Sequence, residues 1–224
     1  MRAICRPSIP VGDAVADTIK IAIAGPKTGT ETQYADMQFI GVKQAIKDIN
    51  ARGGVNGKMV ESKEYDDGGD PKKAVAAANR IVNDGVKFVI GHMASVTTQP
   101  ASDIYEDEGV IMITPGVTDP EITARGYQLI FRTVPVGSAQ DPAVGNSFAK
   151  DPENKAIVDA IKADGKDPNG LYVFPAYSAV QLIAEGIKAA KSEDTDKVAK
   201  ELHSGTFRTS IGTISFDEKG DLKD

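Results

Sequence analysis

Short apolar runs alternate with amphipathic stretches along most of the chain. The first run places isoleucine at every second position, which is typical of a buried strand: Ile19, Ile21 and Ile23. The next stretch ends at Gly53-Gly54 and has apolar residues at helical spacing, namely Phe39, Val42, Ile46 and Ile49. A strand over Met59–Tyr65 follows. Asp70-Pro71 then starts a helix whose apolar face is Val75, Ala78, Ile81 and Val82.

The stretch that comes next adds polar loops to this pattern. Runs over Phe88–Ile90 and Val110–Ile113 predict two more strands. Between them we expect a helix that runs to about Glu108, with Ser95 among its hydroxyl caps. Ligands of doubly wound sheets bind outside the carboxyl ends of the strands. Ser95 and Thr118 both lie on such loops, so they are the first candidates for ligand contacts.

This order of elements predicts an α/β fold. Strand, helix, strand, helix and strand within about 75 residues indicate right-handed βαβ units on a doubly wound, mostly parallel sheet with helices on both faces. The later chain adds a strand at Leu129–Val134, helices at Lys155–Ala163 and from Pro175, an amphipathic piece at Val198–Leu202, and a final strand, Ile211–Phe216, that turns at Asp217–Gly220. Residues 135–154 show no convincing apolar periodicity.

Composition excludes several kinds of function. Hydrophobic residues make up 41% of the 224 residues and charged residues 26%, which is ordinary for a globular protein. The net charge of -6 comes without a basic stripe, so we expect no nucleic-acid partner. No run approaches the roughly 18 apolar residues of a membrane span, so we expect no direct membrane insertion. Cys5, His92 and His203 lie too far apart for a cysteine or histidine metal site, and no cofactor is expected.

Residues 1–16 differ from the rest of the chain. Arg2 and Arg6 resemble the charged start of a secretory signal, and Ala14-Val15-Ala16 has the form of a cleavage site. The apolar centre of a signal peptide is missing between them. We interpret the segment as an atypical leader, with a disordered extension as the alternative. The folded part is then expected to begin at Asp17.

The sequence argues against an enzyme. The loop Gly25–Thr30 lacks the Lys-Ser/Thr of a phosphate-binding loop and the glycine fingerprint of a dehydrogenase. No nucleophile–base pair is apparent, and the acidic run Asp103–Glu108 is typical of a solvated helix face. An enzyme on a doubly wound sheet therefore remains only as an alternative, and no catalytic residue is assigned.

Seven segments together carry a family resemblance: IKIAIAGPKTG, YDDGGDPKKAVAAANRIVNDGVKFVIGH, TTQPASDIYEDEGVIMITP, TARGYQLIFRT, DPENKAIVDAIK, FPAYSAV and FDEKGDLK. Over residues 17–224 the chain resembles the branched-chain amino-acid-binding proteins of bacterial ABC transporters, which are periplasmic binding proteins of type I. The resemblance implies a periplasmic protein that captures leucine, isoleucine or valine and delivers it to a membrane permease. It implies no catalysis and no cofactor.

The resemblance assigns ligand contacts to eight positions: Tyr34, Met93, Ala94, Ser95, Gly116, Val117, Thr118 and Tyr172. The N-terminus of the helix near Ser95 can take the ligand carboxylate, because helix N-termini carry unpaired N–H groups and partial positive charge. Thr118 and the Gly116 carbonyl suit the polar ends of an amino acid, and the other large side chains suit its apolar side. From the residues alone, Ser95 could be a simple helix cap, Thr118 a turn residue, and both tyrosines packing residues.

The chain also departs from the family pattern. After LIFRT the family's chain crosses into a second lobe, whereas here about twenty residues lead into a segment that belongs to the first lobe again. We therefore expect one lobe over 17–224, made of segments 17–134 and 155–224 joined by the junction 135–154, with most of the second lobe missing. The acidic side chain that meets the ligand ammonium in the family belongs to that lobe. We expect weakened binding, or else a non-binding fragment or a lobe that works only by pairing with another chain.

Overall fold

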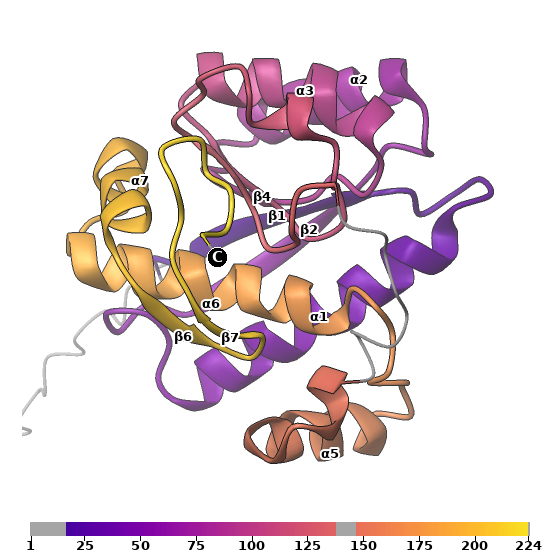
Figure 1. Ribbon diagram of the computed structural model, residues 1–224, viewed down its shortest axis with the longest axis vertical. Coiled ribbons are helices and arrows are strands. Elements are labelled where there is room, and N and C mark those ends of the chain that lie inside the picture. Colours follow the sequence, from indigo (N-terminus) through magenta and orange to yellow (C-terminus); the bar gives the residue numbers. More distant parts are fainter. Residues whose placement is uncertain (1–16, 138–146, 224) are drawn as a thin grey trace, which may run out of the picture.

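A five-stranded parallel sheet forms the middle layer of the protein (Figure 1). The structure is a computed structural model that describes residues 17–137 and 147–223. The strand order is β2-β1-β3-β4-β5. The strands are β1 (Ile19–Gly25), β2 (Val60–Asp66), β3 (Phe88–Ile90), β4 (Ile111–Thr114) and β5 (Ile130–Arg132). The predicted doubly wound sheet is confirmed.

Helices cover both faces of the sheet. One face carries α1 (Thr32–Ala51) and α6 (Val173–Ala190), and the other carries α2 (Pro71–Asn83) and α3 (Ser95–Asp107) (Figure 1). The remaining elements are α5 (Lys155–Ala163) against α1, α7 (Thr195–Ser204) against α6, the hairpin of β6 (Phe207–Thr209) and β7 (Gly212–Ile214), and the 3-10 turns η1 (Pro120–Ile122) and η2 (Pro152–Asn154). The later segment 155–223 thus packs onto the layers that residues 17–137 begin.

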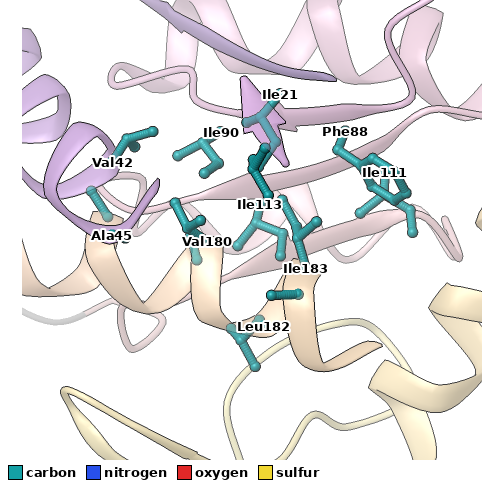
Figure 2. Close-up of a cluster of buried hydrophobic side chains, with 14 of the residues drawn as sticks. Ile21, Val42, Ala45, Phe88, Ile90, Ile111, Ile113, Val180, Leu182 and Ile183 are labelled. Atoms are coloured by element: carbon teal, nitrogen blue, oxygen red, sulfur yellow. The ribbon is translucent and has the colours of Figure 1, made fainter. Parts of the chain in front are cut away.

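The alternation of side chains along the strands divides the interior into two cores. In β1, Ile21 faces α1 and α6, whereas Ala22 faces α2 and α3. Figure 2 shows the first core, in which Val180 and Ile183 of α6 lie against strand residues such as Ile113. Each such side chain contributes roughly 1.5–3 kcal/mol on full burial. Both faces of the sheet are therefore stabilised by the described residues themselves.

Local capping explains where several helices start. Asp70 accepts hydrogen bonds from the Lys72 and Lys73 amides at 2.9 and 3.0 Å, and Pro71 occupies the first turn of α2, as predicted. The apolar face of α2 is rotated from the expected one. Its buried residues are Ala74, Ala77, Ala78 and Ile81, whereas Val75 and Val82 are only half-buried. Small residues point inward here because α2 packs closely on its neighbours.

Other predicted boundaries need correction. Among the described residues no hydroxyl caps α3, whose N-cap is Ala94, and α6 begins at Val173 rather than at Pro175. Strand β5 is shorter than the expected Leu129–Val134. The expected single strand Ile211–Phe216 is wrong, since a tight turn at Ser210-Ile211 folds this region into the β6–β7 hairpin. Residues 1–16 and residues 138–146, which form the middle of the junction 135–154, lie outside the described residues.

Residues 215–222, here called the C-terminal segment, run beside β5. Phe216 forms an antiparallel bridge with Leu222 around the predicted turn, and its ring packs on Phe131 with centroids 5.0 Å apart. The Arg132 amide donates to the Gly220 carbonyl at 3.1 Å. The C-terminal segment thereby covers the β5 edge of the sheet.

The close crossing of α1 and α6 gives the first prediction. A Cβ added to Gly41 would lie 2.1 Å from the Val173 carbonyl oxygen, a backbone atom that cannot move alone. We expect Gly41→Ala to lower the free energy of unfolding by roughly 1–3 kcal/mol through overpacking. Gln33→Ala, at an exposed position of the same helix, is the control and should change stability little. Urea denaturation measures both, and a Gly41→Ala protein as stable as the parent would contradict this account of the crossing.

Candidate functional site

The sheet has a topological switch point between β1 and β3. β1 leads into α1 on one face, whereas β3 leads into α3 on the opposite face. The loops after the two strands therefore separate, and in open α/β sheets ligands bind in the crevice outside the carboxyl ends at such a point. Gln38 of α1 is buried beneath it, and its Nε2 donates to the carbonyls of Ala24 and Ile90 at 3.2 and 2.7 Å. The amide thus ties the ends of β1 and β3 together.

The loop after β3 is held from below. Gly91 has a φ of 137°, and an added Cβ would lie 2.1 Å from the Ala24 carbonyl oxygen, so only glycine fits this turn. The Thr114 hydroxyl donates to the His92 carbonyl at 2.8 Å. These contacts fix the backbone that leads into α3.

A buried polar chain holds the His92 ring. Its Nδ1 lies 2.6 Å from Asp67 Oδ2, and its Nε2 lies 3.1 Å from the Tyr105 hydroxyl. All three side chains are fully buried or nearly so, and burial raises the pKa of Tyr105 well above its usual range, with the Asp67 charge adding to the effect. Buried polar groups of this kind are stable only when they are paired, so the contacts among Asp67, His92 and Tyr105 specify one position for the loop after β3.

The N-terminus of α3 has no side-chain cap among the described residues. Ala94, the N-cap, is extended, with φ and ψ of -121° and 144°. The hydroxyls of Thr97 and Thr98 donate back to the Ala94 carbonyl at 3.0 and 2.8 Å. Both hydroxyls thus serve a carbonyl oxygen and cap no N–H group. Ser95 is the first residue of the helix and is half-buried, so the hypothesis that it is a simple helix cap is wrong.

Two more helices begin at this edge of the sheet. Neither α1, with Glu31 as N-cap, nor α6, with Tyr172 as N-cap, has a side-chain cap in the part of the chain that the structure describes. By contrast, Asp70 and Asp194 cap α2 and α7. Helix N-termini carry about half a positive charge. The edge around α1, α3 and α6 is therefore favourable for an anion.

The loop after β4 carries Gly116, Val117 and Thr118. Val117 is buried in the core beneath α2 and α3, and its carbonyl accepts a hydrogen bond from Arg132 Nη1 at 3.0 Å. Thr118 is half-buried, and its carbonyl accepts from the Gly137 amide at 2.8 Å. The following turn is capped by the Asp119 carboxylate, which accepts from the Glu121 amide at 3.0 Å. The Thr118 hydroxyl is therefore not what caps this turn.

Apolar side chains line the same edge. Met93 lies across the strand ends, with its side chain against Gly25 at one end and Gly116 at the other. Tyr34 and Tyr172 meet edge to face, with ring centroids 5.8 Å apart. Tyr34 is 38% exposed and Tyr172 only 3%, and burial, followed by Tyr34 and Glu31, raises the pKa of Tyr172 to about 12. Tyr172 is thus mainly a packing residue with one edge towards Tyr34.

The described residues hold no group of three or more His, Cys, Asp or Glu side chains placed to bind a metal ion. None of the helices in residues 17–137 and 147–223 is both long and apolar enough to cross a membrane. A hollow of about 990 Å³ between α7 and the C-terminal segment is lined by Gln128 and Leu129, which precede β5, so it lies away from the carboxyl ends of the strands.

A comparison with protein families identifies the architecture. Residues 18–158, more than half of the chain, match the family described as periplasmic binding protein. The chain belongs to the periplasmic binding protein family.

Other members of the periplasmic binding protein family align with nearly the whole chain. The leucine-, isoleucine-, valine-, threonine- and alanine-binding protein of Pseudomonas aeruginosa is 39% identical over 328 positions, which cover 93% of this chain and 88% of that protein. The leucine-specific-binding protein of Salmonella typhimurium is 35% identical over 330 positions, covering 94% and 89%. Because this chain has only 224 residues, more than 100 of those 328 positions have no counterpart in it.

A solved structure confirms the fold. The branched-chain amino acid transporter substrate-binding protein of Streptococcus pneumoniae, in complex with isoleucine, superposes with a TM-score of 0.79. The match covers 92% of this chain and 94% of that chain at 17% sequence identity. The expected fold and family are both confirmed.

The eight sequence-predicted positions come from loops and helix starts at this edge of the periplasmic binding protein fold. Two pairs touch, Met93 with Gly116 and Tyr34 with Tyr172. Ala94 and Ser95 form the start of α3, while the Val117 side chain points into the core. Sequence reasoning missed Gln38 and Arg132. A glutamine within the apolar stripe of α1 could have indicated the first, but no local pattern could have indicated the second.

A carboxylate beside the site gives a pH-dependent prediction. Asp66 accepts hydrogen bonds from the Thr28 hydroxyl at 2.7 Å and from the amides of Lys27, Thr28 and Gly68 at 2.8–3.2 Å. Burial alone would raise the pKa of Asp66, but these hydrogen bonds outweigh it and lower the pKa. The stabilisation is thus present above the unfolded value of about 4 and is lost as pH falls through the lower folded pKa.

We expect Asp66→Asn to reduce the free energy of unfolding by roughly 1 kcal/mol at pH 7. An uncharged amide oxygen accepts the hydrogen bonds of the three backbone N–H groups more weakly than a carboxylate oxygen does. The variant should also lose less stability than the parent between pH 5 and pH 2, in the range about the unfolded pKa. Asp36→Asn, at an exposed position of α1, is the control. Equal losses for Asp66→Asn and the parent on acidification, measured by urea denaturation at each pH, would show that Asp66 is not stabilised as described.

Proposed function

We propose that this chain is the substrate-binding component of a bacterial ABC transporter for branched-chain amino acids. It captures leucine, isoleucine or valine without chemical change. The Pseudomonas relative is named for binding all three amino acids and the Salmonella relative for leucine alone, and they align with 93–94% of the chain at 35–39% identity. The observation that carries the proposal is the uncapped N-terminus of α3 at the switch point, which begins at Ser95 and neighbours the loop after β4 through the contact of Met93 with Gly116.

This edge suits the two ends of a free amino acid. The carboxylate accepts hydrogen bonds from the first N–H groups of α3 and from the Ser95 hydroxyl, where the helix dipole favours negative charge. The Thr118 hydroxyl and the Gly116 carbonyl take up the polar atoms around the ligand Cα. Met93 and the exposed edge of Tyr34 pack on the aliphatic side chain.

The proposed partner is a membrane permease, and the proposed location is the periplasm. Both follow from the family, whose members named above bind amino acids and, in the Streptococcus case, serve a transporter.

In this proposal all contacts with the ligand come from one open lobe. The described residues form a single layered α/β unit, and more than 100 positions of the first relative have no counterpart in this chain. We assign these positions to the second lobe, which supplies the partner of the ligand ammonium in the family. The competing proposal is a lobe that binds leucine only when it is paired with another chain. Gel filtration with and without leucine distinguishes the two, because it shows whether the protein that binds leucine is a monomer or a larger assembly.

The open lobe predicts weak binding. Losing the acidic partner and the enclosure together costs about 3–4 kcal/mol, at the lower end of the penalty for unpairing a buried charge, because water still hydrates the exposed ammonium. At about 1.4 kcal/mol per tenfold, affinity falls by two to three decades. We expect calorimetry on the monomer to give a Kd for leucine no tighter than about 100 μM, if an intact relative binds near 1 μM. A sub-micromolar Kd would contradict the open-lobe arrangement.

Two substitutions test the contacts themselves. Ser95→Ala and Thr118→Ala should each weaken leucine binding by roughly 1–3 kcal/mol, since each removes a hydroxyl from a polar ligand group. Thermal stability should change much less. Ser204→Ala, which removes a hydroxyl from an exposed position of α7, is the control. Leucinamide, which lacks the carboxylate, should not bind. If Ser95→Ala and Thr118→Ala both bind leucine with the affinity of the parent, neither residue belongs to the site.

A further inference from the structure

Arg132 is a buried arginine at the carboxyl end of β5, and its side chain is fully shielded from solvent. Nη1 donates to the Val117 carbonyl at 3.0 Å, and Nη2 donates to the Asp119 carbonyl at 3.0 Å. These two carbonyls flank Thr118 on both sides. One guanidinium thus holds the backbone before and after this residue of the proposed ligand site.

Asp221 of the C-terminal segment is the counterion. Its Oδ1 lies 2.6 Å from Arg132 Nε as an ion pair, without the alignment of a good hydrogen bond. Thr123 joins the two groups, because its hydroxyl accepts from Arg132 Nη2 at 2.6 Å and donates to Asp221 Oδ1 at 2.8 Å. Burial lowers the pKa of Arg132 and the Asp221 charge opposes this, so the carboxylate is what keeps a guanidinium acceptable in this interior.

The backbone is shaped to bring Asp221 to this place. Gly220 has a φ of 87°, and an added Cβ would lie 2.1 Å from the Ile130 carbonyl oxygen. Only glycine allows the C-terminal segment to approach β5 this closely. The backbone path at Gly220 therefore brings Asp221 next to Arg132.

We propose that Arg132 and Asp221 are positioning residues for Thr118, so that the C-terminal segment sets the geometry of the ligand site. This inference rests on the function proposed above. The loop 115–119 belongs to no strand or helix, so its carbonyls depend on the planar fork of the guanidinium. Lysine cannot replace it, because an ammonium offers no planar set of donors to several fixed oxygens.

The test compares amide hydrogen exchange at residues 116–119 with leucine affinity, in the full chain. Asp221→Asn keeps the shape of the side chain but removes the charge. We expect exchange at these four amides to become at least about tenfold faster and the leucine Kd to rise roughly three- to tenfold. Arg132→Lys should do the same.

Matched variants separate positioning from general destabilisation. Thr123→Val removes the bridging hydroxyl and should reproduce the Asp221→Asn effects, whereas Thr123→Ser keeps the hydroxyl and should restore the parent behaviour. Val198→Ala truncates a buried side chain of α7 away from this loop. It should lower the thermal midpoint without changing exchange at 116–119 or the leucine Kd.

The outcomes decide the two proposals separately. Unchanged exchange at 116–119 in Asp221→Asn and Thr123→Val, or an equal increase in Val198→Ala, would overturn the positioning role. Because exchange needs no ligand, it decides this point even if the parent fails to bind leucine, a result that would instead overturn the proposed function. Faster exchange with an unchanged leucine Kd would show that the pair holds the loop but does not position Thr118 for binding, which also overturns the inference.

Discussion

Backbone carbonyls that leave a parallel sheet have no neighbouring strand to pair with, and this protein satisfies them with buried side chains. Gln38 serves the ends of β1 and β3, Thr114 serves His92, and Arg132 serves the loop after β4. An unpaired buried carbonyl costs about as much as a lost hydrogen bond, so each of these contacts is needed for the loop to keep its path. The geometry of the candidate site depends on this inner layer of polar contacts.

The N-terminus of α3 belongs to the candidate site that these contacts support. Within the described residues, the first N–H groups of α3 have no side-chain cap. The threonines of that helix, which would be obvious caps, donate to a carbonyl instead. An anionic ligand group is what such an edge accepts most readily.

Sequence reasoning predicted the layers because they depend on local patterns. The alternating isoleucines of β1 and the Asp70-Pro71 start of α2 each encode their structure within a few residues. The start of α3 could not be predicted in this way, because the choice between Ser95 and Ala94 as N-cap depends on how His92 is anchored to Asp67 and Tyr105.

The contact of Arg132 with Asp221 was equally hidden. It joins residues far apart in the sequence, and a single arginine in a strand pattern indicates only an edge or a surface position. The hairpin of β6 and β7 was missed for a related reason, since three-residue strands carry too little alternation to separate a turn from a strand. Local sequence patterns do not reveal structure that depends on contacts between residues far apart in the sequence.

The packed layers and the candidate site occupy different parts of the described chain. Helices cover both faces of the sheet, although more than 100 positions of the Pseudomonas relative have no counterpart in this chain. The edge at the carboxyl ends of the strands is different. Of the large hydrophobic residues that are exposed in the described chain, Tyr34, Val96 and Val136 follow β1, β3 and β5 at this edge, whereas Met59 precedes β2. In the function proposed above, these apolar groups and the N-termini of α1, α3 and α6 form one side of the amino-acid site, and a site with one side can orient an amino acid but cannot exclude water from it.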